Sequence, residues 1–205
     1  MARDTSPIVK QSRREGYALH PKAHKILLRK PGIPGQHSGG RQSKPSLYQI
    51  QLREKQKVRR LYGLLEKQFS KLMKEASSRD GLSGENLLQL LELRLDNVVY
   101  RSSLATSRRA ARQLVGHGHF ELNGRRVDIP SIRVKAGDVI TVRPKSQKSG
   151  YFSVVDEVVA NSLQVPLSWM KSDTKKLKIE ITGLPTRAET DPDINEQLIV
   201  EYYSR

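Results

Sequence analysis

Residues 106–129 read TSRRAARQLVGHGHFELNGRRVDI, a helix signal followed directly by a hairpin signal. Ser107 stands where its side chain can cap a helix by accepting a backbone N–H from the first turn. Gly116 and Gly118 follow the helical run, and glycine tolerates the left-handed conformation that often ends a helix. The stretch therefore predicts one short helix, closed by glycine and followed by a turn of chain.

The hairpin signal is the pair Asn123-Gly124 between two short runs. This pair favours a type I′ turn, because that turn needs a positive φ at both central residues. A two-residue turn places Phe120 opposite Val127 and Glu121 opposite Arg126. One face of the hairpin is therefore expected to pack and the other to pair charges.

The predicted helix carries a basic face. At 100° per residue, Arg108, Arg109 and Arg112 fall within one arc, and apolar residues occupy the other side. The planar guanidinium group suits phosphate oxygens and stacks on bases. A solvated basic surface is the alternative, but few acidic residues stand nearby to neutralise the cluster. The pattern favours an RNA-binding face that also includes Arg125 and Arg126.

The composition also points to a polyanionic partner. The 205 residues carry a formal net charge of +16, a pI near 10.2, a mean hydropathy of −0.60 and 36% apolar residues. Residues 156–205 have a net charge of −3, so residues 1–155 carry +19. The length suits one domain or two small ones, parts of which are expected to order only against a partner.

Several classes of protein are disfavoured. The absence of cysteine removes disulfides, thiolate catalysis and Cys-ligated zinc. No apolar run approaches the roughly 18 residues of a membrane span, and the N-terminus lacks the apolar core of a secretory signal. No phosphate-binding glycine loop, His-Glu-x-x-His motif or nucleophile elbow occurs. We expect a cytoplasmic protein that is not an enzyme, holds no metal or cofactor and contacts no membrane.

The histidines and carboxylates suggest no catalytic group. His20 and His24 are four residues apart, but two imidazoles without further ligands rarely hold a structural metal. His117 and His119 flank a glycine beside the basic face, and we interpret them as neutral hydrogen-bond donors to RNA or as turn residues. The scattered carboxylates are expected to be local charge partners, namely Asp96, Glu121, Asp128 and Asp138.

The first 46 residues show no clean periodicity, and proline and glycine interrupt residues 30–46. A basic segment of this kind is either disordered or draped over a nucleic acid, and its charge density favours draping. Its candidate RNA contacts are Arg3, Arg13, Arg14, Arg41 and Lys44.

Residues 47–76 are predicted to form one long helix with an apolar stripe. Its run 53–60 is too strongly one-signed for an ordinary solvent face, and we interpret it as contacting phosphate. The candidates are Arg53, Lys55, Lys57, Arg59 and Arg60. A second helix is predicted across residues 87–101, with Arg94, Asn97 and Arg101 lined up on one edge.

Two more strands are predicted at 132–134 and 139–142. Beyond them, we expect a short helix near 154–161, a strand over 176–181 and a closing strand over 198–203. Trp169 is interpreted as a packing anchor rather than as a base-stacking ring.

Ordered motifs spread from about residue 31 to the last residue resemble those of bacterial small-subunit ribosomal protein S-four. They are PGQH (34–37), LREKQKVRRLYG (52–63), GENLL (84–88), RLDNVVYR (94–101), ARQLV (111–115), VDIPS (127–131) and INEQLIVEYYSR (194–205).

This resemblance implies an α+β fold in which a mainly helical domain is interrupted by a small alpha-L RNA-binding module of helices and short antiparallel strands. The expected divisions are a basic arm and linker (1–46), a helical domain (47–93), the module (94–157) and a C-terminal segment packing back on the helical domain (158–205).

The resemblance further implies primary binding to 16S ribosomal RNA at a multi-helix junction, nucleation of 30S assembly and a contribution to translational accuracy. Implied neighbours are the small-subunit proteins S-five and S-twelve and messenger RNA where it enters, near Arg41 and Lys44. The remaining candidate RNA contacts of the module are Ser107, Gln113 and Asn123. Many relatives bind a metal through four cysteines in the arm. Here Val9 and Ser12 stand where the first pair would be, so no metal role is carried over.

Two other classes remain as alternatives. The same module resembles one appended to RNA-modifying enzymes, but residues 1–93 and 144–205 do not match a catalytic domain. A non-specific DNA-binding protein is a weaker alternative, because helix-turn-helix spacing is not obvious.

Overall fold

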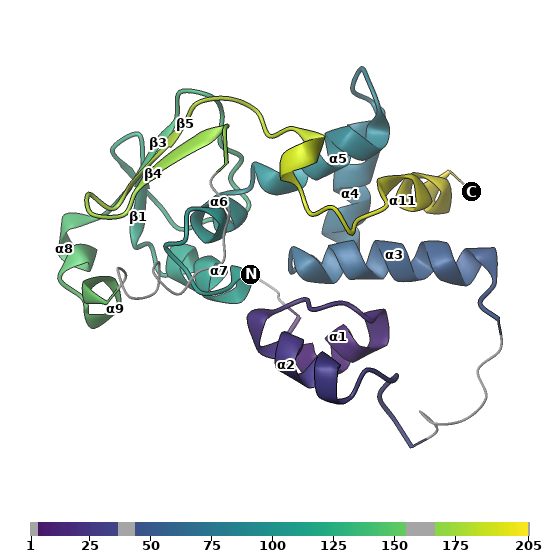
Figure 1. Cartoon of the computed structure of the whole chain (residues 1–205). Helices are drawn as coiled ribbons and strands as arrows, with labels where there is room; N and C mark the ends of the chain where they lie inside the picture. The colour runs from purple at the N-terminus through teal and green to yellow at the C-terminus, as the bar shows by residue number, and fades with distance from the viewer. Residues whose placement is uncertain (1–3, 37–43, 155–166, 205) are drawn as a thin grey trace. The chain divides into compact units, whose positions relative to one another are not determined.

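The computed structural model describes residues 4–36, 44–154 and 167–204, and it divides the chain into two compact units. Unit 1 comprises residues 1–87 and 191–205, and unit 2 comprises residues 88–190. Figure 1 shows the helices and strands of each unit along the colour ramp. The chain therefore leaves unit 1, builds unit 2 and returns to unit 1 for its last helix.

Unit 1 is helical in its described residues. Its elements are α1 (Ile8–Glu15), α2 (Pro21–Arg29), α3 (Leu47–Leu61), α4 (Glu66–Ser77), the first half of α5 (Ser83–Glu92) and α11 (Glu196–Tyr203). The side chain of Ser46 caps α3 by accepting from the backbone N–H of Gln49, at 3.2 Å. The apolar stripe predicted for this region is buried from Val58 onward, with Val58 and Phe69 fully enclosed, whereas Leu47 and Ile50 at the start of α3 are exposed.

The predicted single helix over 47–76 is two helices. α3 ends at Leu61, and Gly63 then adopts a φ of +65° before α4 begins at Glu66. Glycine accepts this left-handed conformation without a steric penalty, so the chain turns there. Both helices bury an apolar face, so the apolar periodicity continues across the break. The sequence pattern therefore gave no sign that the first helix ends at Leu61.

The N-terminal arm contains two helices that the sequence analysis did not predict. α1 buries Gln11 and Ser12 rather than apolar side chains, and α2 buries only Ala23. An inner face made of polar and small residues leaves no hydrophobic period to detect. The arm is folded on its own hydrogen bonds over the described residues 4–36.

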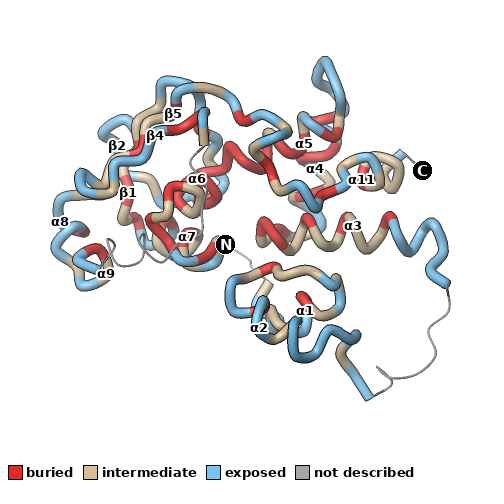
Figure 2. The backbone as a smooth tube through the Cα atoms, viewed as in Figure 1, coloured by how far each residue is buried: buried red, intermediate tan, exposed pale blue. Residues whose placement is uncertain are grey.

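Unit 2 combines helices with a small antiparallel sheet. Its further elements are α6 (Leu95–Arg101), α7 (Arg108–Gly116), β1 (Phe120–Leu122), β2 (Arg125–Val127), β3 (Val139–Val142), α8 (Pro144–Gln147), α9 (Gly150–Ser153), β4 (Met170–Asp173), β5 (Lys178–Ile181) and the 3-10 helix η1 (Arg187–Glu189). Among the described residues the sheet has five strands in the order β2-β1-β3-β5-β4. Figure 2 shows that buried positions gather on α6 and on the inner side of the sheet.

The helix and hairpin predicted from residues 106–129 are confirmed. Ser107 caps α7 by accepting from the backbone N–H of Ala110, at 3.2 Å. β1 pairs with β2 in the predicted register, with Phe120 opposite Val127. Asn123 and Gly124 have φ values of +50° and +77°, as the turn requires.

Two other predictions in this unit are wrong. The helix predicted over 87–101 breaks at residues 93–94, where α5 ends and α6 begins. The predicted strand at 132–134 is instead an isolated bridge between Arg133 and Arg94, supported by a hydrogen bond from the N–H of Val134 to the carbonyl of Leu93. Residues 132–134 thus pair with the backbone at the break between α5 and α6. This pairing accounts both for the interrupted helix and for the missing strand.

The last third of the chain departs most from expectation. β5 confirms the strand predicted over 176–181, but the closing strand predicted over 198–203 is helix α11. Asn195 caps α11, whose Ile199 is fully buried, and α11 packs on α3. Residues 155–161 of the helix predicted near 154–161 lie outside the described residues.

Unit 2 is larger than the module boundaries 94–157 predicted from the sequence. β3 pairs with β5, and β5 pairs with β4, so residues up to Ile181 extend the sheet that the hairpin begins. Within the predicted C-terminal segment 158–205, only residues 191–205 belong to unit 1. The described helices include none that is both long and apolar enough to cross a membrane.

Candidate nucleic-acid interface

The exposed candidate residues of unit 2 lie on α7, at its C-terminal end and on the hairpin. The exposed candidates of this unit are Arg109, Gln113, His117, Asn123, Arg125 and Arg126. In unit 1 the exposed candidates are Arg14 and Lys44, while Arg3 and Arg41 lie outside the described residues. Among these candidates, Arg109, Arg125 and Arg126 therefore come from one helix and one hairpin of the same compact fold.

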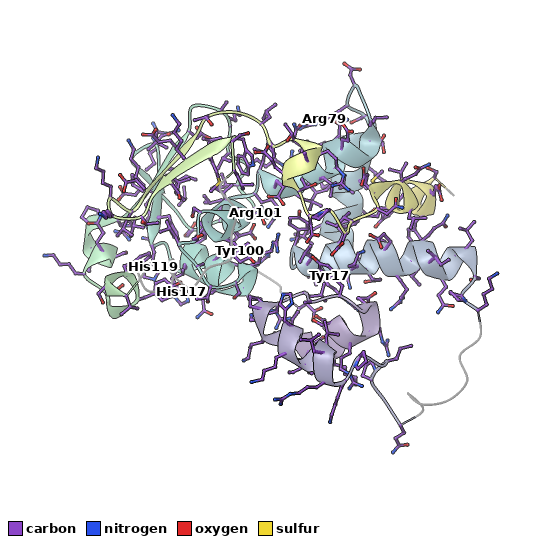
Figure 3. All side chains as sticks on the ribbon, in the orientation of Figure 1. Tyr17, Arg79, Tyr100, Arg101, His117 and His119 are labelled. Atoms are coloured by element: carbon purple, nitrogen blue, oxygen red, sulfur yellow. The ribbon has the colours of Figure 1, made fainter. Side chains whose placement is uncertain are left out.

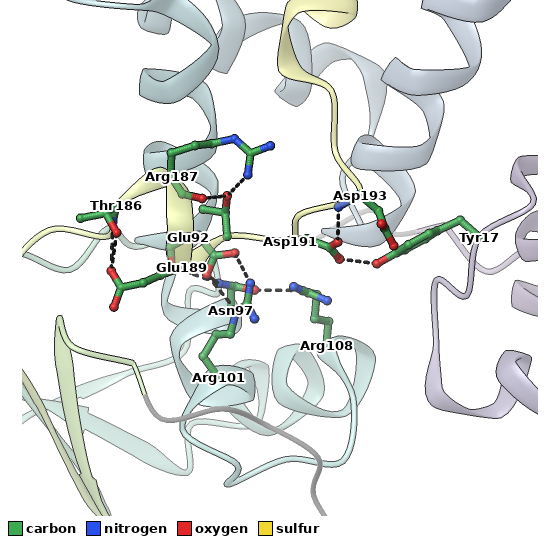
Figure 4. Close-up of polar contacts among 11 residues, drawn as sticks. Tyr17, Glu92, Asn97, Arg101, Arg108, Thr186, Arg187, Glu189, Asp191 and Asp193 are labelled. Carbon is green, nitrogen blue, oxygen red and sulfur yellow. Dashed lines mark hydrogen bonds and ion pairs between the residues drawn. The ribbon is translucent and has the colours of Figure 1, made fainter.

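Arg108 is only half exposed, because neighbouring side chains hold it in place. Its Nε donates to Oδ1 of Asn97 at 2.9 Å, and its guanidinium lies 4.6 Å from the ring centroid of Tyr100. Asn97 in turn donates through Nδ2 to the Glu92 carboxylate at 2.8 Å. Figure 3 labels Tyr100, and Figure 4 shows the chain of contacts from Arg108 to Glu92.

Glu92 is a buried carboxylate that sequence analysis missed. Arg101 binds it with both arms, Nη2 donating at 2.8 Å and Nε at 3.0 Å. The side chain of Glu92 is 1% exposed. Such a paired, hydrogen-bonded geometry makes burial of both charges tolerable. Glu92 lies beside a predicted apolar stripe and nine residues before Arg101, and neither position gave a signal of this role.

Asp96 organises a second set of arginines. It accepts two hydrogen bonds from Arg94, at 3.1 and 2.8 Å, and one from Arg112, at 3.2 Å. Arg94 is nearly as buried as Asp96, with side chains 5% and 6% exposed. Asp96 was predicted to be a local charge partner, and these ion pairs confirm it.

Two further candidates fix the local backbone. Ser107 is the buried cap of α7. Asn123 donates through Nδ2 to Asp138 at 2.8 Å and accepts from the backbone N–H of Val139 at 2.9 Å. These contacts tie the hairpin turn to the start of β3, so they hold Arg125 in place.

The basic run of α3 is tied into ion pairs within unit 1. Lys55 donates to Glu66 at 2.9 Å and lies 4.6 Å from the ring centroid of Tyr202, while Lys57 pairs with Glu54 at 2.9 Å. Burial opposes ionisation of Glu66, but hydrogen bonds from Lys55 and Tyr203 hold its pKa below the usual value. Lys55 itself is 3% exposed.

The arginines of the same helix hold the N-terminal arm. Arg53 and Arg60 both pair with Glu15 at the end of α1, and Arg59 lies near Glu66 on the other side. Burial raises the pKa of the Glu15 carboxyl despite the two nearby guanidinium groups. Tyr17 adds a hydrogen bond from its hydroxyl to Asp191 (Figure 4).

Hydrogen bonds connect the helices of the described part of the N-terminal arm. Ser12, one of the positions where relatives were expected to carry cysteine, donates to the carbonyl of Ile8 and accepts from the backbone N–H of Leu19. Arg13 donates to the carbonyl oxygens of Lys30 and Gly32 at 3.1 and 3.0 Å. Across the described ranges no group of three His, Asp or Glu side chains could hold a metal ion. The contacts of Arg13 connect α1 to the residues after α2.

Comparison with known proteins agrees with this architecture. Residues 93–140 match the family described as "S4 domain", and residues 3–92 match "Ribosomal protein S4/S9 N-terminal domain". Together with the fold of unit 2, these matches define a protein that carries an alpha-L RNA-binding module. The chain belongs to the small ribosomal subunit protein uS4 family, the family that its motifs resemble.

Curated relatives match along the whole chain. The "Small ribosomal subunit protein uS4" of Clostridioides difficile (strain 630) is 50% identical over 211 residues, covering 100% of each chain. Proteins of the same name are 51% identical over 205 residues in Nocardioides sp. (strain ATCC BAA-499 / JS614) and 48% identical over 207 residues in Chlorobium phaeovibrioides (strain DSM 265 / 1930). Both also cover 100% of each chain.

Proposed function

We propose that the chain is a structural, non-catalytic constituent of the small ribosomal subunit in the cytoplasm and that it binds 16S ribosomal RNA. The observation that carries this proposal is the exposure of Arg109, Arg125 and Arg126 on α7 and the hairpin of the RNA-binding module. Guanidinium groups displace counterions from the phosphate backbone and recognise folded RNA through phosphates, 2′-hydroxyls and splayed bases. The full-length match to small-subunit proteins supports this over an RNA-modifying enzyme.

The burial pattern supports two kinds of role among the candidate residues. We assign direct RNA contact to the exposed group: Arg14, Lys44, Arg109, Gln113, His117, Asn123, Arg125 and Arg126. We assign mixed roles to the half-buried group, which holds neighbours in place and presents part of each side chain: Arg13, Arg53, Lys57, Arg59, Arg60, Arg101, Arg108, Arg112 and His119. The buried group positions the others: Lys55, Arg94, Asn97 and Ser107.

Membership of the uS4 family supports a proposal of finer roles. We propose that the protein nucleates assembly of the 30S body as a primary binder, contributes to translational accuracy and borders the path by which messenger RNA enters. Its proposed protein neighbours are S-five and S-twelve. For the path of messenger RNA, the arm supplies the cations Arg13 and Arg14, and the residues after it supply the exposed Lys44.

A charge-reversal experiment tests the RNA-binding face. The triple variant Arg109→Glu, Arg125→Glu, Arg126→Glu is compared with the wild-type chain for binding to a multi-helix junction fragment of 16S rRNA, across a series of salt concentrations. We expect the affinity to fall at least about 100-fold and the salt slope to become shallower by about two to three, because each lost phosphate contact lowers it by roughly 0.7–0.9.

The matched control reverses three cations elsewhere in the same unit: Lys171→Glu, Lys175→Glu, Lys176→Glu. These exposed lysines lie on or beside β4, where Lys176 pairs with Asp173 at 3.8 Å. Because the change in net charge is the same, a general loss of attraction would weaken both variants equally. Equal weakening, or normal binding by the first variant at physiological salt, would contradict the proposed face.

A further inference from the structure

The tripeptide His117-Gly118-His119 forms a corner between the end of α7 and the start of β1. The two imidazole rings lie 6.0 Å apart between centroids, and Figure 3 labels both at this end of unit 2. His117 is exposed, and His119 is half buried against Phe152, whose ring centroid is 5.8 Å away. Two titratable groups therefore share one surface feature beside the proposed RNA face.

The side chain of an arginine, Arg126, also lies at this corner. A Cβ atom placed on Gly118 would lie 2.7 Å from Nε and 2.8 Å from Nη2 of Arg126, so the guanidinium rests directly on the glycine backbone. Gly118 also has a φ of +71°. The positive φ favours glycine at this position, and the guanidinium group of Arg126, from β2, lies against the loop between the two histidines.

Arg143 completes the cluster from the end of β3. Its Nη1 donates to the carbonyl of Gly118 at 3.2 Å, and its backbone N–H donates to the carbonyl of His119 at 2.9 Å. Its Nε lies 3.8 Å from Glu121, the carboxylate that faces the corner from β1. On the α8 side, Nδ1 of His119 hydrogen-bonds with Oγ of Ser146 at 3.0 Å.

The corner disfavours a charged imidazole while no anion is bound. Burial lowers the pKa of His119, and the nearby His117 and Arg143 lower it further. His119 is therefore neutral at pH 7 in the RNA-free protein. A phosphodiester placed among Arg126, Arg143 and the imidazoles would reverse this balance, because a negative charge within hydrogen-bond distance favours the protonated ring.

We propose that this corner binds one backbone phosphodiester of RNA and that the His117/His119 pair takes up a proton as the phosphate binds. This inference rests on the proposed RNA-binding function and gives it a specific subsite. The proton goes from solvent to an imidazole nitrogen, and no covalent bond to the phosphate forms. Because the bound state holds the extra proton, affinity rises as pH falls through the pKa of the bound state and levels off below that of the free protein.

The experiment measures binding of the full chain to the 16S rRNA junction fragment at constant ionic strength from pH 8.0 to 5.5. The wild type is compared with the double variant His117→Asn, His119→Asn, in which asparagine can still reach Ser146. We expect the wild-type affinity to rise about tenfold over this range, the change that a one-unit difference in pKa between bound and free protein produces. The double variant is expected to show less than a threefold rise over the same range.

A matched control removes another histidine. His24→Asn changes an exposed imidazole on α2, and it should retain the wild-type pH dependence. Titration of the RNA bases affects the wild type and the double variant alike. It therefore cancels when the pH dependence of the variant's affinity is subtracted from that of the wild type. Histidine NMR signals of the wild-type chain give a second readout: the pKa of one of the two imidazoles should rise on adding the RNA, whether or not the double variant folds well.

The outcomes separate this inference from the proposed function. If the wild type binds the RNA but the double variant keeps the same pH dependence, or no imidazole pKa rises on binding, the proton-coupled phosphate site is wrong and RNA binding stands. If no variant binds the junction RNA at any pH, the proposed function itself fails.

Discussion

The basic run of α3 and the basic face of α7 and its hairpin have the same appearance in the sequence, yet they differ in the structure. On α3, Lys55 and Arg60 lie against carboxylates of unit 1, Glu66 and Glu15. On the hairpin, Arg125 and Arg126 are exposed. The partners of α3 come from other segments, 11 and 45 residues away in the chain. A one-signed run therefore does not reveal whether its charges hold the protein together or face a ligand.

Unit 2 contains both kinds of arginine within one small fold. Arg94 and Arg112 meet at Asp96, and Arg101 meets Glu92, while Arg109 on the same face of α7 remains exposed. The ion pairs connect α5, α6 and α7. They therefore determine where the exposed arginine of α7 lies. Reversal of Arg108 and Arg112 together with Arg109 is therefore expected to disrupt packing as well as RNA binding.

The largest effect on stability is expected for replacement of Asp96. In Asp96→Ala the buried guanidinium of Arg94 loses its two hydrogen bonds, and Arg112 loses its ion pair. We expect a loss of about 3–5 kcal/mol in the free energy of unfolding, because an uncompensated charge remains buried. Urea denaturation measures the loss, and the exposed Asp128→Ala is the control, expected within about 0.5 kcal/mol of wild type. A change under 1 kcal/mol for Asp96→Ala would show that these arginines are not held by it.

A pair of variants sharpens the contrast between the two basic regions. Lys55→Met removes a buried ammonium with its ion pair and its contact to Tyr202, and we expect a loss of about 2 kcal/mol in stability with less than a threefold change in RNA affinity. Arg125→Ala should show the reverse, a stability change under about 0.5 kcal/mol and a roughly tenfold weaker affinity. Parallel unfolding and filter-binding measurements decide the matter. The contrast fails if both variants affect stability and affinity in the same proportion.

Two glycines with the same backbone conformation offer a smaller test. Gly16 and Gly118 have φ values of +63° and +71°, but only Gly118 has Arg126 lying where a side chain would go. Each change to alanine should cost about 1 kcal/mol from backbone strain, because at Gly118 the flexible end of Arg126 can move aside at little further cost. Thermal unfolding compares the two stabilities. Only Gly118→Ala should weaken RNA binding, since it moves Arg126; equal effects of both on affinity would argue against that placement.

The smallest effect concerns a carboxylate held by hydrogen bonds instead of cations. Burial opposes ionisation of Glu189, but hydrogen bonds from Ser168 and Thr186 outweigh it and hold its pKa at about 2 (Figure 4 shows the Thr186 contact). Because this pKa lies below the ordinary 4.5, its stabilisation is present above pH 4.5 and is lost as pH falls toward 2.

After allowance for solvent screening, this loss is about 1 kcal/mol. The unfolding free energies of wild type and Glu189→Gln are therefore expected to converge by that amount between pH 4.5 and pH 2. An offset between the two that stays constant across this range would show that the hydrogen bonds do not favour the ionised form.

Local signals in the sequence were sufficient where the structure is local. The Ser107 cap and the Asn123-Gly124 turn each act within a few residues, so α7 and the hairpin register could be predicted. The run 198–203 misled, because its β-branched and aromatic residues favour a strand. Its cap at Asn195 and its packing on α3 override that preference, and the second cannot be seen in the run itself.

The candidate site was predictable in composition but not in arrangement. Its arginines could be named from the sequence, yet Glu92 and Asp96, which decide where Arg101 and Arg112 lie, act through contacts 9 and 16 residues away. The corner at Gly118 depends on Arg126 crossing from the far strand of the hairpin. Periodicity describes which side of an element a residue occupies, and neither of these contacts follows from it.

The sheet of unit 2 ends in β2 on one side and β4 on the other. An edge strand exposes unpaired backbone N–H and C=O groups. These groups can pair with a strand of another chain, including a second copy of the same protein. β2 carries the exposed Arg125 and Arg126, and β4 carries the exposed Lys171 and Asp173. Two copies meeting through β2 would press guanidinium against guanidinium. The exposed arginines of β2 are therefore expected to oppose pairing of two copies through this edge of the sheet.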